Sequence, residues 1–429
     1  MPIATSRDVE HAVVGGVCAG IASRYQYPVS RVRAATIALS VATAGIGGLA
    51  YLALWRALPS TTAHHYLSKA MNEPELTYVA KNSIKENNLM QDMIKPASDS
   101  LDKNLSAPTN SALYGPVASD LPLVTETLSN VAQGVGFDFL ETMLTQQLTG
   151  SGKMMRPGIA LLAARLGNYN LDKVVPLAAS VELLHSASLV HDDVIDEADE
   201  RRGNTTANSL FGNSASVMLG DYMFANAAEL IARTNNTEVV RRFAETLMMM
   251  VRGELTQDVT VFEYSEDVQR YLDRITGKTA SLFSTAAEGG ALVSNAPTDQ
   301  IEAMRTYGLR LGVAFQIIDD VLDFTGDPEI MGKPVGSDLR SGTLTLPAIL
   351  YMQQKPNDNP IKRAFEGQRR RANFDHAIQD ILTSTYVAES IETAHRFGQE
   401  ARETLQALPV GETRKTLDRL VDYVLERDS

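Results

Sequence analysis

Two clusters of aspartate residues are the part of this sequence best suited to chemistry. In the first cluster the aspartates occupy positions i, i+1 and i+4, and they are Asp192, Asp193 and Asp196. The second cluster repeats that spacing with Asp319, Asp320 and Asp323. On a helix, residues i and i+4 lie on one face, a turn apart, so each cluster can present two carboxylates to the same point. Such paired oxygen ligands favour a hard cation such as Mg²⁺.

The surroundings of the second cluster argue against a merely solvated acidic surface. The first cluster alone is compatible with a hydrated helical face. The second is flanked on every side of a helical wheel by apolar residues, which are Val313, Phe315, Ile317, Ile318, Val321, Leu322 and Phe324. Such a helix is expected to be buried, and buried carboxylates are costly unless cations or protons compensate them. We therefore predict that the two clusters face each other across a bundle and enclose Mg²⁺ ions and a polyphosphate.

Several basic residues are candidates for binding phosphate groups. Lys153 and Arg156 lie three positions apart in the segment SGKMMRP. This segment is not a P-loop, because Gln147 replaces the first glycine and a methionine follows the lysine. The other candidates are Arg201, Arg202, Lys278, Lys333 and His185. Each basic residue alone is compatible with an ordinary surface charge, and His185 with a satisfied core histidine.

The elements that must position these residues are helices. Over residues 119–429, apolar residues recur at three- and four-residue spacing, as in Leu121, Val124 and Leu128, and Gly and Pro cluster between the periodic blocks. This pattern predicts an all-α, antiparallel helix bundle. Residues 60–118 are rich in Ser, Asn, Lys, Ala and Pro and are predicted to form a polar linker. Residues 1–59 form a separate N-terminal domain.

Composition narrows the function further. The net charge of −13 argues against a nucleic-acid partner, because phosphate backbones require basic surfaces. Cys18 is the single cysteine, which excludes an internal disulfide framework and a cysteine-based zinc site. The start of the chain lacks the apolar core of a signal peptide. The uncharged run 34–55 is long enough, at about 33 Å of helix, to cross a bilayer core of about 30 Å. Flanking arginines favour the membrane over a buried helix of a soluble domain.

Residues 119–429 resemble the trans-isoprenyl (polyprenyl) diphosphate synthases. The motifs of that family occur in its order, as GKxxRP, ExxHxxSLxHDDxxDxxxxRRG, GExxQ, KTAxLF, FQxxDDxxDxxG and GKPxxxDLRxGxxTLP. Each motif alone is unspecific, but the combination is highly specific. The resemblance implies an isoprenoid-synthase type of bundle around a central cavity, usually in a homodimer.

The resemblance also implies roles for the candidate residues. The six aspartates would hold Mg²⁺ ions that bind an allylic diphosphate. The same diphosphate would be clamped by Arg201, Lys278 and Lys333. Isopentenyl diphosphate would be bound by Lys153, Arg156, His185 and Arg202. Thr279 and Gln316 would lie near the reacting carbons.

The implied reaction agrees with the chemistry of these residues. The C–O bond of the allylic diphosphate ionises, the double bond of isopentenyl diphosphate attacks the cation, and a proton is lost. Mg²⁺ and cationic side chains stabilise charge on the leaving diphosphate, and an apolar pocket keeps water away from the cation. Two positions depart from the family pattern, with Met154 where a basic residue is common and Thr343 in place of a lysine. Both acidic clusters are complete, so we predict an active enzyme.

The residues before the first acidic cluster predict a long product. The growing chain is expected to run back along the helix from Asp192, where a bulky aromatic four or five positions earlier would block it. Ala187 and Ser188 occupy those positions, and Leu184 follows one turn further. We therefore predict a linear product longer than farnesyl diphosphate, such as the precursor of a quinone side chain.

Residues 8–59 resemble a PspC domain, from the GGVCAGIA start to the YLALWxxLP end, which implies membrane association. The arginines before the apolar run favour a cytoplasmic N-terminus, and a re-entrant hairpin at TAGIGG would return the chain to that side. We therefore expect a membrane-associated protein whose catalytic domain faces the cytoplasm. Two alternatives are a class I terpene cyclase, which normally lacks a second DDxxD and the Lys153/Arg156 pair, and a non-catalytic membrane-linked regulatory subunit.

Overall fold

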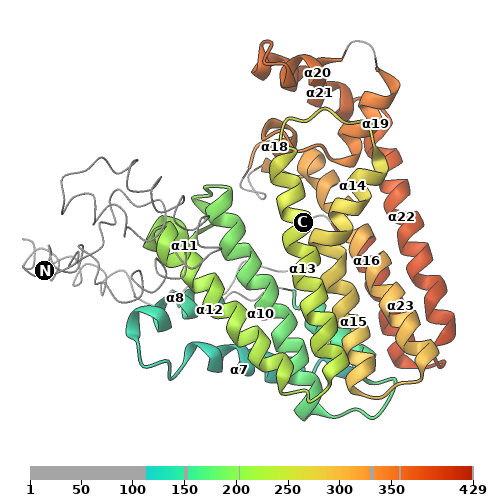
Figure 1. Ribbon diagram of the computed structural model, residues 1–429. Helices are drawn as coiled ribbons and strands as arrows, with labels where there is room; N and C mark the ends of the chain where they lie inside the picture. Colours follow the sequence, from blue (N-terminus) through green and yellow to red (C-terminus); the bar gives the residue numbers. More distant parts are fainter. Residues whose placement is uncertain (1–112, 149–152, 202, 329–332, 357–358, 428–429) are drawn as a thin grey trace, which may run out of the picture. The chain divides into compact units, whose positions relative to one another are not determined.

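The small and apolar residues of one helix form the centre of a helix bundle. This helix, α15 (Ser281–Val293), packs against α9 (Met155–Ala164), α10 (Leu171–Ile195), α13 (Thr237–Val259) and α16 (Thr298–Thr325). The long helices run alongside one another (Figure 1). At Gly290 of α15, an added Cβ would lie only 2.2 Å from the carbonyl oxygen of Ala160. A residue without a side chain is therefore what lets the backbones of α15 and α9 approach so closely.

The computed structural model describes residues 113–148, 153–201, 203–328, 333–356 and 359–427. All of them belong to one compact unit, Ser106–Ser429. The predicted N-terminal domain, the apolar run 34–55 and most of the predicted linker lie outside the described residues. Within the predicted linker, Tyr114 and Val117 are described and are fully buried in the compact unit.

The remaining elements surround the central helices. Before α9 come η1 (Gly115–Val117), α7 (Leu121–Ala132) and α8 (Asp138–Leu148). Between α10 and α13 the chain forms β1 (Glu200–Arg201), β2 (Asn204–Thr205), α11 (Ala207–Phe211) and α12 (Asn213–Ala232). Between α13 and α15 it forms α14 (Val268–Ile275) and the π-helical turn η2 (Thr276–Ala280). The elements after α16 are α18 (Ser337–Arg340), α19 (Leu346–Gln354), α20 (Pro360–Phe365), α21 (Arg370–Leu382), α22 (Tyr386–Thr404), η3 (Leu405–Ala407) and α23 (Glu412–Leu425).

Side-chain caps define where several site-bearing helices begin. The side chain of Asn170 accepts a hydrogen bond from the backbone N–H of Asp172 at the start of α10. Asn236 caps α13 and Asp267 caps α14 in the same way. Each cap satisfies backbone donors that have no partner within the helix. Short polar residues at these three positions therefore fix the start of helices that carry the acidic site.

The all-α prediction is confirmed over the described residues. Strand structure there is limited to β1 and β2, which pair antiparallel with Arg201 opposite Asn204. The only described helix that is long and apolar enough to cross a membrane is α10. It packs against α9, α12 and α15, so its apolar character is that of a core helix.

Candidate active site

The first acidic cluster lies at the C-terminal end of α10. Asp192 and Asp193 belong to its last turn, and Asp196 is the residue that ends it. Asp193 is buried, and its Oδ1 accepts a hydrogen bond from Nε of Arg201 at 2.7 Å. The β1–β2 hairpin thus folds Arg201 back onto the cluster. The C-terminus of a helix carries partial negative charge, so carboxylates there require positive charge nearby.

The turn η2 supplies part of that charge. Nζ of Lys278 lies 2.6 Å from Oε2 of Glu254, on α13. The charge of Lys278 also acts on Asp192 and Asp196, lowering the pKa of both, whereas Glu254 raises them. Lys278, Glu254 and the first cluster therefore share one electrostatic environment.

The next residue of η2 connects to the second acidic cluster, which lies near the C-terminal end of α16. Oγ1 of Thr279 donates to Oε1 of Gln316 at 2.7 Å. Nε2 of Gln316 donates to Oδ1 of Asp320 at 2.8 Å, and the Tyr271 hydroxyl donates to Oδ2 of Asp320 at 2.7 Å. Adjacent residues of η2, Lys278 and Thr279, thus bring the two predicted clusters to one region of the bundle.

The other aspartates of the second cluster have cationic partners. Asp323 is buried, and its Oδ1 lies 2.7 Å from Nζ of Lys333. Lys333 also lies 3.5 Å from Asp338, whose backbone N–H donates to Oδ2 of Asp323. Asp319 differs from the buried-helix expectation, because half of its side chain is exposed; its Oδ1 lies 2.7 Å from Nη2 of Arg427. The helix turns Asp320 and Asp323 inward and Asp319 toward the surface.

Burial makes the ionised form of these carboxylates costly, and the neighbouring cations do not fully offset that cost. Burial raises the pKa of Asp192 to about 6, against the effect of Lys278. Burial and the neighbouring Asp338 raise the pKa of Asp320 to about 7. Burial also raises the pKa of Asp193, Asp196 and Asp323, despite their cationic partners. A bound cation would therefore stabilise the ionised forms.

The donor set suits a cation that binds together with a phosphate ligand. Among the described residues, no three acidic, cysteine or histidine side chains converge closely enough to coordinate a metal ion by themselves. Mg²⁺ is usually held by one or two carboxylates plus substrate phosphates, rather than by a cage of protein ligands. Carboxylates that lie near Lys278, Lys333 and Arg201 fit a Mg²⁺ ion shared with a substrate phosphate.

The predicted basic pair lies at the start of α9, with Lys153 in the loop before the helix and Arg156 in its first turn. Nζ of the exposed Lys153 lies 5.5 Å from the centre of the Tyr423 ring, on α23. The guanidinium carbon of Arg156 lies 4.5 Å from the centre of the Phe283 ring, on α15. Cation–π contacts of this kind hold a basic side chain without neutralising its charge. These contacts place the two cations at the start of α9, each beside an aromatic ring.

The remaining predicted residues lie on α10 or outside the described part of the chain. Leu184 and Ala187 are fully buried, whereas His185 and Ser188 are half-buried. Oγ of Ser188 donates to the carbonyl of His185 at 2.8 Å. Arg202 lies outside the described residues.

Several site residues were not predicted from the sequence. Glu254 belongs to the motif GExxQ and Asp338 to DLR, so both stood within recognised segments without an assigned role. Tyr271 and Arg427 carry no local signal. Their contacts join residues 49 and 108 positions apart, which only the folded chain brings together.

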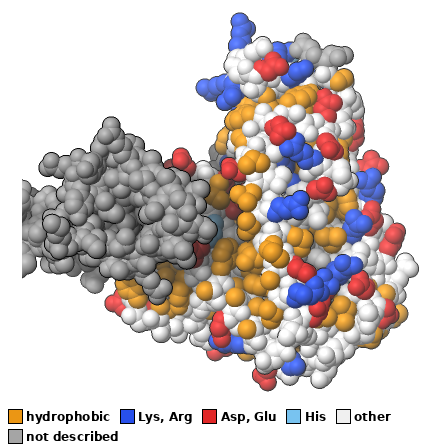
Figure 2. Space-filling view, viewed as in Figure 1, with side chains coloured by type: hydrophobic (Ala, Val, Ile, Leu, Met, Phe, Trp, Pro, Cys, Tyr) orange, Lys and Arg blue, Asp and Glu red, His pale blue; other side chains and the backbone are white. Residues whose placement is uncertain are grey.

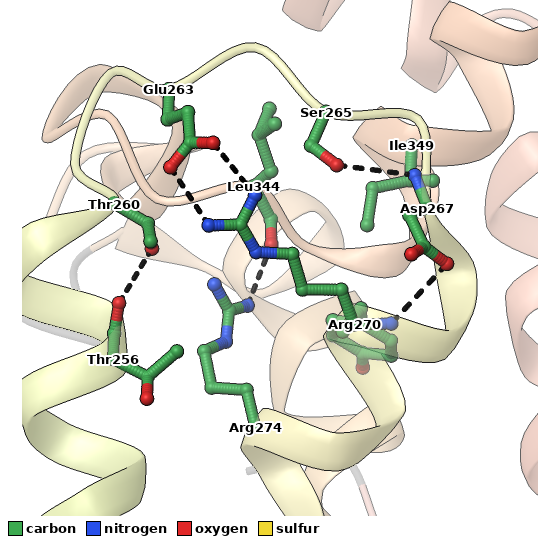
Figure 3. Close-up of a pocket in the computed structure, with 10 residues that line it drawn as sticks. Thr256, Thr260, Glu263, Ser265, Asp267, Arg270, Arg274, Leu344 and Ile349 are labelled. Carbon is green, nitrogen blue, oxygen red and sulfur yellow. Dashed lines mark hydrogen bonds and ion pairs between the residues drawn. The ribbon is translucent and has the colours of Figure 1, made fainter.

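A small pocket is lined by residues of α13, α14 and the neighbouring loops, and side-chain contacts connect its lining residues (Figure 3). Arg274 donates to the carbonyl of Leu344 at 2.6 Å, and Arg270 pairs with Glu263 at 2.7 Å. The first contact joins α14 to the loop before α19, and the second joins α14 to the loop that follows α13. Tyr271 also lines this pocket, so these contacts hold the helix whose Tyr271 hydroxyl donates to Asp320.

The fold and the site define an all-α enzyme with paired aspartate clusters and a separate basic loop. A sequence profile described as Polyprenyl synthetase matches residues 137–381. A protein named prenyl transferase from Synechocystis is 37% identical over 323 residues, which cover 74% of this chain and 99% of the relative. The octaprenyl diphosphate synthase of Escherichia coli is 36% identical, over 66% of this chain and 88% of the relative.

The solved structures that are similar to this chain bear names of the same kind. A decaprenyl diphosphate synthase from Rhodobacter capsulatus is 35% identical with a TM-score of 0.69, covering 75% of this chain and 99% of that one. A polyprenyl synthase from Caulobacter crescentus, complexed with calcium and isoprenyl diphosphate, is 31% identical with a TM-score of 0.69, covering 76% and 100%. The chain belongs to the polyprenyl synthetase family. It is an enzyme, a prenyltransferase of the trans-polyprenyl diphosphate synthase type.

The N-terminal resemblance is confirmed as well. A profile described as PspC domain matches residues 5–61. This match indicates association with a membrane, and it lies entirely before the first described residue.

Proposed function

We propose that this enzyme extends an allylic diphosphate with isopentenyl diphosphate in a Mg²⁺-dependent reaction, and that the predicted site residues carry it out. The observation that carries the proposal is that adjacent residues of η2 act on both acidic clusters, Lys278 through the effect of its charge on Asp192 and Thr279 through its hydrogen bond to Gln316, which donates to Asp320. The clusters and their cations form one diphosphate site, and Lys153 and Arg156 at the start of α9 form a second. Two anionic substrates need two such sites.

The residues have distinct tasks in this proposal. The aspartates hold the cations of the allylic diphosphate, and Arg201, Lys278 and Lys333 bind its oxygens. Bound Mg²⁺ supplies positive charge to the leaving diphosphate as its C–O bond breaks. Lys153, Arg156, His185 and Arg202 hold isopentenyl diphosphate, whose double bond attacks the allylic cation before a proton is lost. Thr279 and Gln316 lie near the reacting carbons, and their hydrogen bonds orient Asp320.

One assay tests this assignment. The full-length protein is incubated with farnesyl diphosphate, labelled isopentenyl diphosphate and Mg²⁺, and the products are identified by mass. Longer linear diphosphates support the proposal, whereas cyclic hydrocarbons would indicate a terpene cyclase. Replacing Asp192 and Asp193 together by alanine should abolish condensation and leave the far-ultraviolet circular dichroism unchanged. Turnover retained by that variant would refute the assigned metal site.

We further propose a long-chain product. Ala187 and Ser188 leave the helix free of aromatic residues four and five positions before Asp192, and Leu184 is of medium size. The relatives named for hepta-, octa- and solanesyl diphosphate synthesis are consistent with this length. Mass spectrometry decides the point, and farnesyl diphosphate as the sole product would contradict it.

A homodimer is the assembly that the surface of α13 supports. This helix exposes a row of apolar side chains, which are Met248, Val251, Leu255 and Val259. Hydrophobic side chains gather on the same side of the compact unit (Figure 2). An apolar face of this kind is typical of a protein interface, and a second copy of this chain offers a matching one. Light scattering of the purified protein measures its mass, and a monomer at micromolar concentration would exclude the dimer.

The PspC match supports a membrane tether for the catalytic domain. We propose that residues 1–59 attach to the membrane, that residues 60–118 link them to the catalytic domain 119–429, and that this domain faces the cytoplasm. There it meets diphosphate substrates in water and delivers an apolar product to the bilayer. Cell fractionation tests the tether, and a fully soluble full-length protein would exclude it.

A further inference from the structure

Tyr114 is a buried residue just before η1 whose place in the fold is tightly constrained. Its side chain is fully buried. A Cβ added to Gly158 of α9 would lie 2.3 Å from the Tyr114 ring. The ring therefore occupies the space that a side chain at position 158 would need, and its orientation is fixed by close packing.

The hydroxyl of Tyr114 holds the backbone of the basic loop. It donates a hydrogen bond to the carbonyl oxygen of Lys153. Burial, together with Tyr423 and Glu182, raises the pKa of Tyr114, so that the hydroxyl remains a donor at neutral pH. The residue after Lys153, Met154, has a positive φ of 50°. Non-glycine residues adopt that conformation only at a cost in free energy, which surrounding contacts must offset.

Two segments far apart in the sequence therefore hold Lys153, one at its backbone and the other at its side chain. Tyr114 comes from the segment before η1, and Tyr423 comes from α23, where its ring faces Nζ of Lys153. Gly115 packs next to α23, where an added Cβ would lie 3.0 Å from Oγ1 of Thr416. Tyr114 and Tyr423 thus hold Lys153 from two packed elements.

We propose that Tyr114 is a positioning residue for isopentenyl diphosphate, acting through the backbone of Lys153. This inference rests on the proposed role of Lys153 in binding that substrate. A fixed carbonyl sets the direction in which the lysine side chain leaves the loop, and hence where its ammonium group meets the diphosphate. Without the hydroxyl, the loop samples further conformations, and the substrate must select the productive one.

The test compares two tyrosine-to-phenylalanine variants of the full-length protein. Tyr114→Phe keeps the ring and removes the hydroxyl. Tyr307→Phe is the matched control, because Tyr307 is also fully buried and its hydroxyl also donates to a backbone carbonyl, that of Leu417, at 2.7 Å. Both variants lose one hydrogen bond from a buried tyrosine hydroxyl to a backbone carbonyl, and thermal unfolding should show comparable destabilisation.

The kinetic readout separates positioning from stability. Tyr114→Phe should raise the KM for isopentenyl diphosphate roughly 2- to 10-fold, the change that loss of one hydrogen bond corresponds to. The kcat and the KM for the allylic substrate should stay within about twofold, and Tyr307→Phe should leave all three constants unchanged. An unchanged KM in Tyr114→Phe, or an equal increase in both variants, would overturn the inference.

A third variant distinguishes this inference from the proposed function beneath it. Lys153→Ala should raise the KM for isopentenyl diphosphate more than Tyr114→Phe does. If Lys153→Ala has no effect on that KM, the assigned substrate site is wrong and the inference falls with it. If Lys153→Ala raises the KM and Tyr114→Phe does not, the site stands and only the role of Tyr114 is refuted.

Discussion

Replacing Tyr271 by phenylalanine would isolate one hydrogen bond at the second acidic cluster. The hydroxyl of Tyr271 donates to Oδ2 of Asp320 at 2.7 Å, and both side chains are buried. Phenylalanine keeps the ring that packs against the surrounding helices. The substitution therefore removes a donor to the Asp320 carboxylate and little else.

The size of the effect follows from the position of the Asp320 pKa. Burial and Asp338 raise that pKa to about 7, while the hydrogen bonds from Gln316 and Tyr271 lower it. A hydrogen bond to a charged group contributes about 1.5–3 kcal/mol, which corresponds to roughly 1–2 pKa units. At about pH 7.5 the ionised fraction of Asp320 would then fall from roughly three quarters to between about a quarter and a thirtieth.

Because the ionised form is the one that binds a cation, the loss should be measured as a weaker response to Mg²⁺. We expect the Mg²⁺ concentration for half-maximal activity to rise roughly 3- to 25-fold at about pH 7.5, and less than about twofold at about pH 9.5. The matched control is Tyr351→Phe. Tyr351 is also fully buried, and its hydroxyl donates to Oδ2 of Asp380 at 2.9 Å, within the group of α19 and α21.

Three outcomes would contradict this account of the site. An equal Mg²⁺ response in Tyr271→Phe and the unsubstituted enzyme would show that the hydroxyl does not keep Asp320 ionised. A loss of the same size at both pH values would show that the damage is structural. Equal losses in Tyr271→Phe and Tyr351→Phe would also point to stability.

Two further predictions concern stability and product length. In metal-free protein, the folded pKa values of Asp192 (about 6) and Asp320 (about 7) lie above the ordinary value of 3.8. The folded state therefore binds more protons than the unfolded state, and the stability from these groups is lost as pH rises from about 4 to 7. Thermal unfolding in chelator should show this fall, Asp320→Asn should reduce it, and a rise in stability over that range would contradict it. Separately, Ser188→Phe should shorten the product, because an aromatic residue at this half-buried position would block the growing chain. Mass spectrometry of products checks this, with Ser186→Phe as the control, since it carries the same change on another side of α10; equal shortening by both would refute the assigned path.

The fold was predictable because helix periodicity and the all-round apolar character of the second cluster are local properties of the sequence. Asp320 and Asp323 are buried as that character predicts. Asp319 is the exception, because the side of α16 that carries it is partly open to solvent, where Arg427 meets it. A helical wheel gives the composition of each side but not which neighbour covers it.

The partners of the clusters were less predictable, for a related reason. Lys278 was expected at the site, yet its pairing with Glu254 depends on α13 lying beside η2. Tyr271 and Arg427 reach their aspartates only through tertiary packing, across long stretches of sequence. The spacing of residues along one helix indicates candidate ligands, whereas contacts between helices decide which hydrogen-bond donors and charges surround them.

The arrangement around the π-helical turn η2 depends on the number of residues in the turn as well as on their types. Thr276–Ala280 joins α14 to α15, and within it Lys278 serves the first cluster while Thr279 serves the second. In a regular helix, adding or removing one residue rotates everything beyond it by about 100°. A π-helical turn is such a local change of phase, and it lets α14 and α15 face different neighbours within one nearly continuous rod. Deleting Thr276 or Gly277 would leave every proposed site residue in the sequence and yet turn α14 out of phase with α15. Alignments that tolerate a gap at this point would therefore miss a change as severe as the loss of an aspartate.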